Sequence, residues 1–141
     1  TAATTRGESW IVATWDDVAG YLRNNFRPAE DTGELLKIFV NDRRGTARLV
    51  VVEYETPSSI PTEAWATISS PVGNVHCVDL HSVLKRAGER YAVGGLVRVG
   101  DSLMFRHSVP LSSMSVHQFA LPFHLVMTTA AELQDAFLPD S

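Results

Sequence analysis

The chain has 141 residues, of which 45% are apolar and 20% are charged, and its formal net charge is −4. This length is typical of one domain with its own core, and the composition excludes an intrinsically disordered chain. The negative net charge argues against nucleic acid and anionic membrane surfaces as partners, because both are bound through an excess of Lys and Arg.

The cysteine content and the apolar segments bear on where the protein works. Cys77 is the single cysteine, so no intramolecular disulfide can form, which is typical of a reducing compartment. Residues 1–8 contain no apolar stretch like that of a secretory signal. The most apolar segment, residues 119–131, is too short and too polar to span a bilayer. We therefore expect a cytoplasmic protein that does not insert into membranes.

The first regular element is a predicted helix over residues 15–26. Thr14 can cap this helix, and Asp17 completes a capping box with aspartate in place of glutamate. Pro28 ends the helix, because the residue before a proline avoids the helical conformation. Apolar residues at helical spacing form one stripe along it: Val18, Tyr21, Leu22 and Phe26.

A β-hairpin is predicted next. Its two strands cover residues 36–40 and 48–55, and residues 41–45 have the composition of a turn. In the second strand, the alternation of side chains places three residues on one face: Val50, Val52 and Tyr54.

A third strand and a short helix follow. The strand is predicted over residues 64–69, and the segment from Pro71 to Asn74 is expected to break it. Asp79 can cap the helix, and Gly88 is a plausible stop at its carboxyl end.

The last third of the chain predicts a second hairpin and a long helix. The strands cover residues 92–99 and 103–111, and residues 100–102 have tight-turn chemistry. Ser115 and Gln118 form a capping box for the final helix, which closes before Pro139.

The predicted order of elements is α-β-β-β-α-β-β-α. Strands that come in runs joined by antiparallel turns favour an α+β fold, with helices packed on an antiparallel sheet. No linker, repeat or shift of composition divides the chain, so residues 1–141 form one predicted domain with residues 1–9 as a flexible arm.

Motifs of known chemistry are missing from the sequence. The glycines have neither phosphate-loop nor dinucleotide spacing, and there is no nucleophile elbow or zinc-protease histidine pair. His76, Cys77 and His81 lie close together in sequence but match no known zinc spacing, so they are interpreted as a buried thiol, which packs as a small apolar residue, beside surface histidines. We predict no catalytic, cofactor-binding or metal-binding residue.

Partner binding is the function for which the sequence offers candidate residues. Arg106 lies in a predicted strand, where it can either grip a carboxylate of a partner or pair with an acidic neighbour of its own chain. Trp15 opens the first helix, and tryptophan is enriched in binding hot spots. The first helix and the long strand complete the candidate surface with Tyr21, Val50, Val52 and Tyr54.

The chain resembles a known family from about Trp15 to Phe137, and the carboxyl-terminal half carries the motif. The segment from Tyr91 to Leu96 leads into a strand that ends in Val109-Pro110-Leu111, and a short polar link then opens a long capped helix. This layout, together with the order of elements, is similar to the YbjN-type family of bacterial proteins, described as regulators of sensory transduction. The resemblance implies the fold of class I type III secretion chaperones, frequent homodimers and the binding of polypeptides.

Three hypotheses follow for function. The first is a cytoplasmic, noncatalytic protein-binding or chaperone-like module that binds an extended segment of a polypeptide partner along a sheet edge or in an apolar groove. The second is a regulatory domain that senses a small ligand. The third is an enzyme whose site is assembled in space and is not visible in the sequence.

Overall fold

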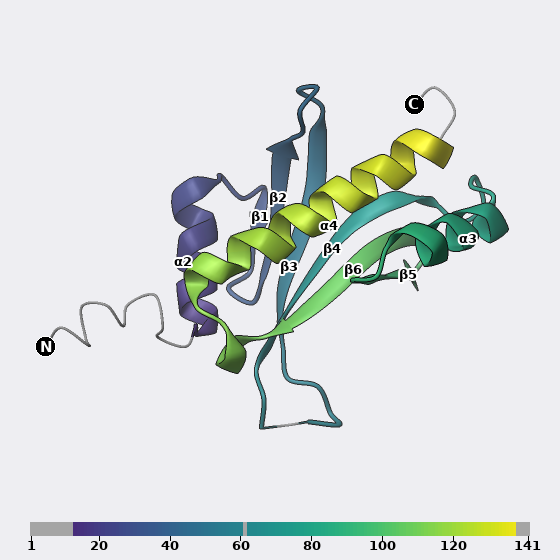
Figure 1. Cartoon of the computed structure of the whole chain (residues 1–141). Helices are drawn as coiled ribbons and strands as arrows, with labels where there is room; N and C mark the ends of the chain where they lie inside the picture. Colours follow the sequence, from purple (N-terminus) through teal and green to yellow (C-terminus); the bar gives the residue numbers. More distant parts are fainter. Residues whose placement is uncertain (1–12, 61, 138–141) are drawn as a thin grey trace, which may run out of the picture.

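The computed structural model describes residues 13–60 and 62–137, and within them the protein has an α+β fold (Figure 1). Six strands form one antiparallel sheet in the order β1-β2-β3-β4-β6-β5. Helices pack on this sheet, which confirms the predicted class. The flexible arm predicted for residues 1–9 lies outside the described residues.

The elements follow the predicted order with one strand added. The helices are α2 (Trp15–Asn25), α3 (Leu80–Arg90) and α4 (Val116–Phe137), with a short 3-10 turn at Leu111–Ser113. The strands are β1 (Glu30–Asp31), β2 (Leu35–Asn41), β3 (Ala47–Glu55), β4 (Trp65–Asn74), β5 (Gly95–Val99) and β6 (Ser102–Pro110). The unpredicted strand is β1, a two-residue pairing with β2.

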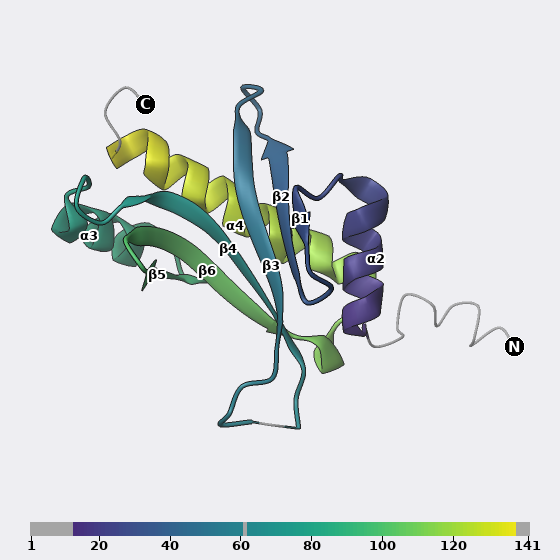
Figure 2. The ribbon, with the colours of Figure 1, turned by 180° about the vertical axis from the view of Figure 1, so that it is seen from behind.

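The core lies between the helices and one face of the sheet. Alternate residues of β2, β3, β4 and β6 are buried there, and they meet Phe119 and Phe123 of α4. α4 crosses β3, β4 and β6, and Figure 2 shows the sheet from the other side, with α4 behind the strands. Among the helices that the structure describes, none combines the length and the apolar character needed to cross a membrane.

Val50 and Val52 belong to this core. Both side chains are fully buried on the helix-covered face of β3, so neither can contact a partner in this conformation. Their proposed part in a binding surface is therefore wrong. The reason is that both faces of β3 are rich in apolar residues, so the sequence does not say which face the helices cover.

The amino end of α2 has the predicted capping box. The amide of Asp17 donates to Thr14 Oγ1 at 3.2 Å, and the amide of Thr14 donates to Asp17 Oδ2 at 3.0 Å. These two bonds satisfy backbone donors that a helix start leaves unpaired.

β4 is longer than the sequence predicts, because Pro71 does not end it. Its pairing with β3 runs only from Trp65 to Ser69, whereas its pairing with β6 continues to Asn74 with a register shift between Pro71 and Gly73. From Ser70 onward β4 therefore has no strand partner on its β3 side, and Ser70 Oγ donates instead to the carbonyl of Leu49 at 2.6 Å. Proline is tolerated there because it lies where the strand behaves as an edge.

α3 also continues past its predicted stop. Asp79 caps it as expected, with its carboxylate accepting from the Ser82 amide at 3.3 Å and the Ser82 hydroxyl at 2.7 Å. Gly88 lies inside the helix, which ends at Arg90, because Gly88 does not adopt the left-handed conformation of a helix-ending glycine.

Acidic conditions should destabilise the protein through two aspartates that accept hydrogen bonds in the folded state. The bond from Arg23 lowers the pKa of Asp31, and the bond from the Ser82 hydroxyl lowers the pKa of Asp79. Both groups ionise at a lower pH in the folded than in the unfolded state, where the pKa of an aspartate is about 3.9. Their contribution to the free energy of unfolding is complete above that pH and is lost as the pH falls through the pKa of the folded state.

We therefore expect a lower urea midpoint at pH 3 than at pH 5. The double variant Asp31→Asn/Asp79→Asn should show a smaller fall over the same interval, because it lacks both carboxylates. An equal fall in the variant and the original chain would show that other groups are responsible.

Arg48 joins the β2–β3 turn to α4, and its side chain is only 9% exposed. Its Nε donates to Asp42 Oδ2 at 2.9 Å and one terminal nitrogen donates to Asp135 Oδ1 at 3.0 Å, while the other donates to Gln134. Asp42 also accepts from the amides of Arg44 and Thr46, so one carboxylate orders the turn and holds the arginine.

Arg48→Met should lower the free energy of unfolding by about 2 kcal/mol, because it removes the charged donor and leaves the Asp42 carboxylate partly buried without it. The change is measured by urea denaturation. Arg44→Met is the matched control: Arg44 is exposed and its pair with Asp135 is 3.5 Å long, so the change should stay within about 0.5 kcal/mol. Equal effects of the two variants would contradict this account.

Candidate functional site

The two edges of the sheet differ in how open they are to another strand. The β1 edge is two residues long, both acidic, and both are paired: Glu30 with Lys37 at 3.5 Å and Asp31 with Arg23 at 2.6 Å. β5 is five residues long, contains three apolar residues and no proline, and pairs only with β6 among the described strands. Proteins usually protect edge strands by shortness, charge or proline, so β1 is a protected edge and β5 is a free one.

α3 presents apolar side chains beside this free edge. Its sequence has an apolar stripe, yet Val83 is the only residue of the helix that is fully buried. Leu80 and Leu84 lie one turn apart and remain 40% and 51% exposed. Val93 and Val99, before and within β5, are also about half exposed, so this region holds four of the seven large exposed apolar residues in the described chain. Such clustering is typical of an interaction surface.

A cavity of about 230 Å³ lies between α3 and the β5–β6 hairpin. We call this cavity, together with Leu80 and the outer edge of β5, the α3–β5 groove. Figure 1 shows α3 and β5 together at one end of the sheet. The cavity is lined by Leu84, Ala87, Gly88 and Tyr91 from α3 and its carboxyl end, and by Gly94, Gly95, Leu96 and Phe105 from the hairpin.

Two contacts shape the wall of the groove. Tyr91 packs edge-on against Phe105, with ring centroids 6.0 Å apart, and its hydroxyl donates to Glu132 on α4 at 2.7 Å. Gly94 has a φ of +85°, and a Cβ atom at this position would lie 2.6 Å from Cζ of Phe105. Glycine is therefore required both by the backbone conformation and by the close approach of the ring.

Arg106 lies elsewhere, on the face of β6 that the helices leave uncovered. Its register partners are Ser69 in β4 and Gly95 in β5. Its Nε is buried and finds no hydrogen-bond acceptor, and the guanidinium makes no ion pair with a carboxylate of the described residues. The structural alternative, a pair with an acidic neighbour, is therefore not found in this part of the chain.

His107 points to the opposite face of β6, as strand alternation predicts. Burial lowers the pKa of His107, because a charged ring is disfavoured away from water. The neighbouring Ser108 shares the uncovered face with Arg106, where its hydroxyl lies 3.0 Å from Thr67 Oγ1, which donates in turn to Glu55.

The three aromatic candidates attach α2 to the rest of the fold. Trp15 stacks on Tyr54 with ring centroids 5.6 Å apart, and its Nε1 donates to the carbonyl of Gly33 at 2.6 Å. Tyr21 packs edge-on against Phe119 of α4 at 6.5 Å. All three are partly buried, and they gather neither with Arg106 nor at the α3–β5 groove.

The histidine cluster of the sequence does not converge in space. His76 Nε2 lies 3.2 Å from Asp101 Oδ1. Cys77 is exposed, so the prediction of a buried thiol is wrong; the residue lies in the turn that joins β4 to α3. Within residues 13–60 and 62–137, no three His, Cys, Asp or Glu side chains lie close enough to hold a metal ion together.

Sequence reasoning missed the α3–β5 groove, although two signals pointed to it. The short helix carries apolar residues at helical spacing, and β5 is a predicted strand. Both signals need the strand order before they indicate a binding surface, because exposure depends on what packs alongside.

The chain matches no model of a known protein family and no curated protein sequence. The resemblance to the YbjN-type family and to secretion chaperones therefore stays a prediction. What the α3–β5 groove can bind follows from its geometry alone.

Proposed function

We propose that this protein is a noncatalytic, polypeptide-binding module that accepts an extended segment of a partner protein along β5. The observation that carries the proposal is the position of a free, apolar edge strand directly beside a helix with exposed leucines and an apolar cavity. Strand addition of this kind uses main-chain hydrogen bonds for affinity and side-chain pockets for specificity.

The bound segment would lie antiparallel or parallel to β5 as a seventh strand of the sheet. Its side chains would alternate, with every second one directed toward α3 and the cavity beneath Leu84. We expect an apolar residue at that position, because Leu84, Leu96 and Phe105 offer it no polar partner.

The size of the cavity supports a peptide rather than a small molecule as the ligand of this groove. Small-molecule sites usually enclose about 300–1,000 Å³. The cavity of about 230 Å³ is smaller than that range and lies beside β5, which suits one side chain of a longer ligand.

The family resemblance adds a homodimer to this proposal, and the single cysteine favours a cytoplasmic location. A second copy of the chain is the competing occupant of β5, because two free edges can pair with each other. Sedimentation over a range of protein concentrations separates the cases: a dimer formed through β5 should dissociate when the groove is filled by peptide, whereas a dimer formed elsewhere should persist.

The proposal is tested by selecting ligands from a displayed library of random peptides longer than the five residues of β5. Selected peptides should share an apolar anchor and alternating apolar positions, and one peptide should block the binding of another. A library that yields no enriched sequence, or only peptides that bind without competing, would overturn the proposal.

A further inference from the structure

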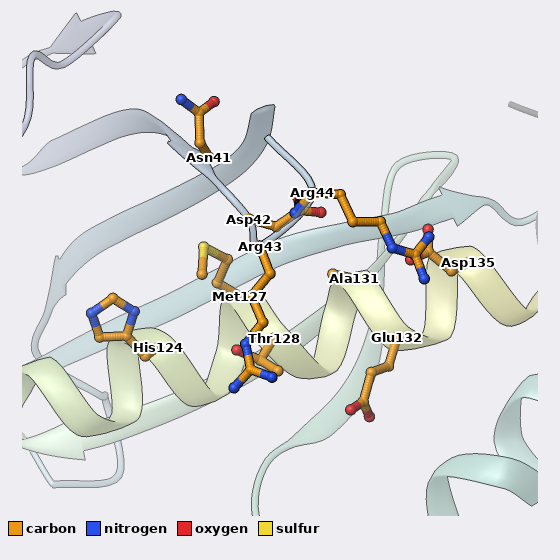
Figure 3. A pocket seen from close by; sticks show the side chains of 10 residues that line it. All are labelled: Asn41, Asp42, Arg43, Arg44, His124, Met127, Thr128, Ala131, Glu132 and Asp135. Atoms are coloured by element: carbon orange, nitrogen blue, oxygen red, sulfur yellow. Dashed lines mark hydrogen bonds and ion pairs between the residues drawn. The ribbon is translucent and has the colours of Figure 1, made fainter. Parts of the chain in front are cut away.

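A second concave region lies along α4, between the β2–β3 turn and α3. One cavity of about 640 Å³ lies between the β2–β3 turn and α4 (Figure 3). Another, of about 330 Å³, lies between α4 and α3. The two share Arg44, Glu132 and Asp135, so we treat them as one arginine basin.

Four arginines from two elements line this basin. Arg43 and Arg44 extend from the turn over α4, where Figure 3 shows Arg43 reaching toward Thr128 and Arg44 toward Asp135. Arg86 and Arg90 lie one turn apart on α3 and line the second cavity. The guanidinium of Arg86 is positioned over the ring of Phe137, 5.8 Å from its centroid.

The carboxylates of the basin are already engaged. Asp135 accepts from Arg48 at 3.0 Å and lies 3.5 Å from Arg44, and Glu132 accepts from the Tyr91 hydroxyl at 2.7 Å. Asp42, the third carboxylate of the lining, accepts from Arg48 at 2.9 Å.

By contrast, three of the arginines are free of such partners. Within residues 13–60 and 62–137, no carboxylate lies within ion-pair distance of Arg43, Arg86 or Arg90. The basin is thus locally cationic in a chain whose net charge is −4. Walls that concentrate one sign of charge raise the local concentration of ions of the opposite sign.

We propose that the arginine basin binds a small oxyanion with more than one negative charge, such as a phosphate or carboxylate compound. Guanidinium groups donate two parallel hydrogen bonds to the planar edge of such an anion. Met127 and Ala131 form an apolar floor beside the charges, and both cavities fall in the size range of small-molecule sites. This site adjoins the α3–β5 groove at Tyr91, which lines both, but its arginines do not line the groove, so the proposal does not depend on polypeptide binding there.

Isothermal titration calorimetry with pyrophosphate and with citrate, at constant ionic strength, tests the proposal. At least one of the two should bind, and the one that binds distinguishes a phosphate site from a carboxylate site. The double variant Arg86→Gln/Arg90→Gln should weaken that binding at least tenfold. The circular dichroism spectrum should stay unchanged, because neither arginine has a hydrogen-bond or ion-pair partner among the described residues.

The control variant carries the same change of net charge at two positions that do not line the basin. Arg27→Gln/Lys37→Gln removes two cations near α2 and β2, outside the basin, and should bind the probe within twofold of the original chain. The proposal is overturned if neither probe binds, or if the two double variants lose binding equally, since the second result would indicate attraction by net charge alone.

Discussion

Replacing Leu84 by aspartate should weaken the binding of a groove-selected peptide at least tenfold, which corresponds to about 1.4 kcal/mol. Leu84 borders the cavity between α3 and β5 and is 51% exposed in the free protein. A bound segment would cover the exposed part, so binding gains the free energy of apolar burial there. Aspartate removes that gain and puts a charge where water is excluded. Fluorescence polarisation of a labelled peptide measures the effect.

The same substitution should leave the fold intact, because Leu84 contributes little to the core. Leu121→Asp provides the matched control: Leu121 is 76% exposed on α4 and does not line the cavity, and the introduced residue is identical. We expect unchanged affinity for Leu121→Asp and a loss for Leu84→Asp. Similar affinities in the two variants would place the peptide outside the α3–β5 groove.

Gly94→Ala should lower the free energy of unfolding by about 3 kcal/mol, through two effects that add. A left-handed backbone strains any residue with a Cβ atom by about 1–2 kcal/mol. The new methyl group would also lie 2.6 Å from the Phe105 ring, and forcing extra volume into a packed site costs about 1–3 kcal/mol. Urea denaturation measures the sum.

Gly33→Ala separates the two effects. Gly33 has a similar φ of +96°, but no atom lies within 4 Å of the position of its Cβ. Its substitution should therefore show the backbone strain alone, about 1–2 kcal/mol. If Gly94→Ala were no more destabilising than Gly33→Ala, the close approach of Phe105 that shapes the groove would be contradicted.

The elements that the sequence predicted well are those specified by local chemistry. The capping box of Thr14 and Asp17 and the turn from residue 41 to residue 45 involve residues close in the chain, and both are found in the structure. The prediction that Pro71 ends its strand is wrong, because the effect of a proline depends on the neighbouring strands. A proline breaks a central strand, but β4 no longer pairs with β3 at Pro71. The prediction that Gly88 ends α3 is also wrong, because a glycine permits a helix to end but does not force it to end.

The binding surface was harder to predict because exposure is a property of the assembled fold. Trp15 is a predicted partner-binding residue because of its residue type. In the structure it stacks on Tyr54 and donates a hydrogen bond to the carbonyl of Gly33, which is eighteen residues away in the chain. Val50 and Val52 are predicted partner-binding residues from the strand with the clearest apolar pattern. Such strands are the ones that folding buries, and both residues are fully buried. Leu84 differs only in its surroundings, since α3 lies at the end of the sheet beside an edge strand.

Hydrogen–deuterium exchange of the protein with and without a selected peptide tests strand addition most directly. Amides on the outer edge of β5 have no strand partner in the free protein, so they should exchange slowly only when the peptide pairs with them. We predict new protection confined to Gly95–Val99 and the neighbouring face of α3, with none at the β1 edge. Protection at the β1 edge or on the uncovered face around Arg106, without change in β5, would contradict the account.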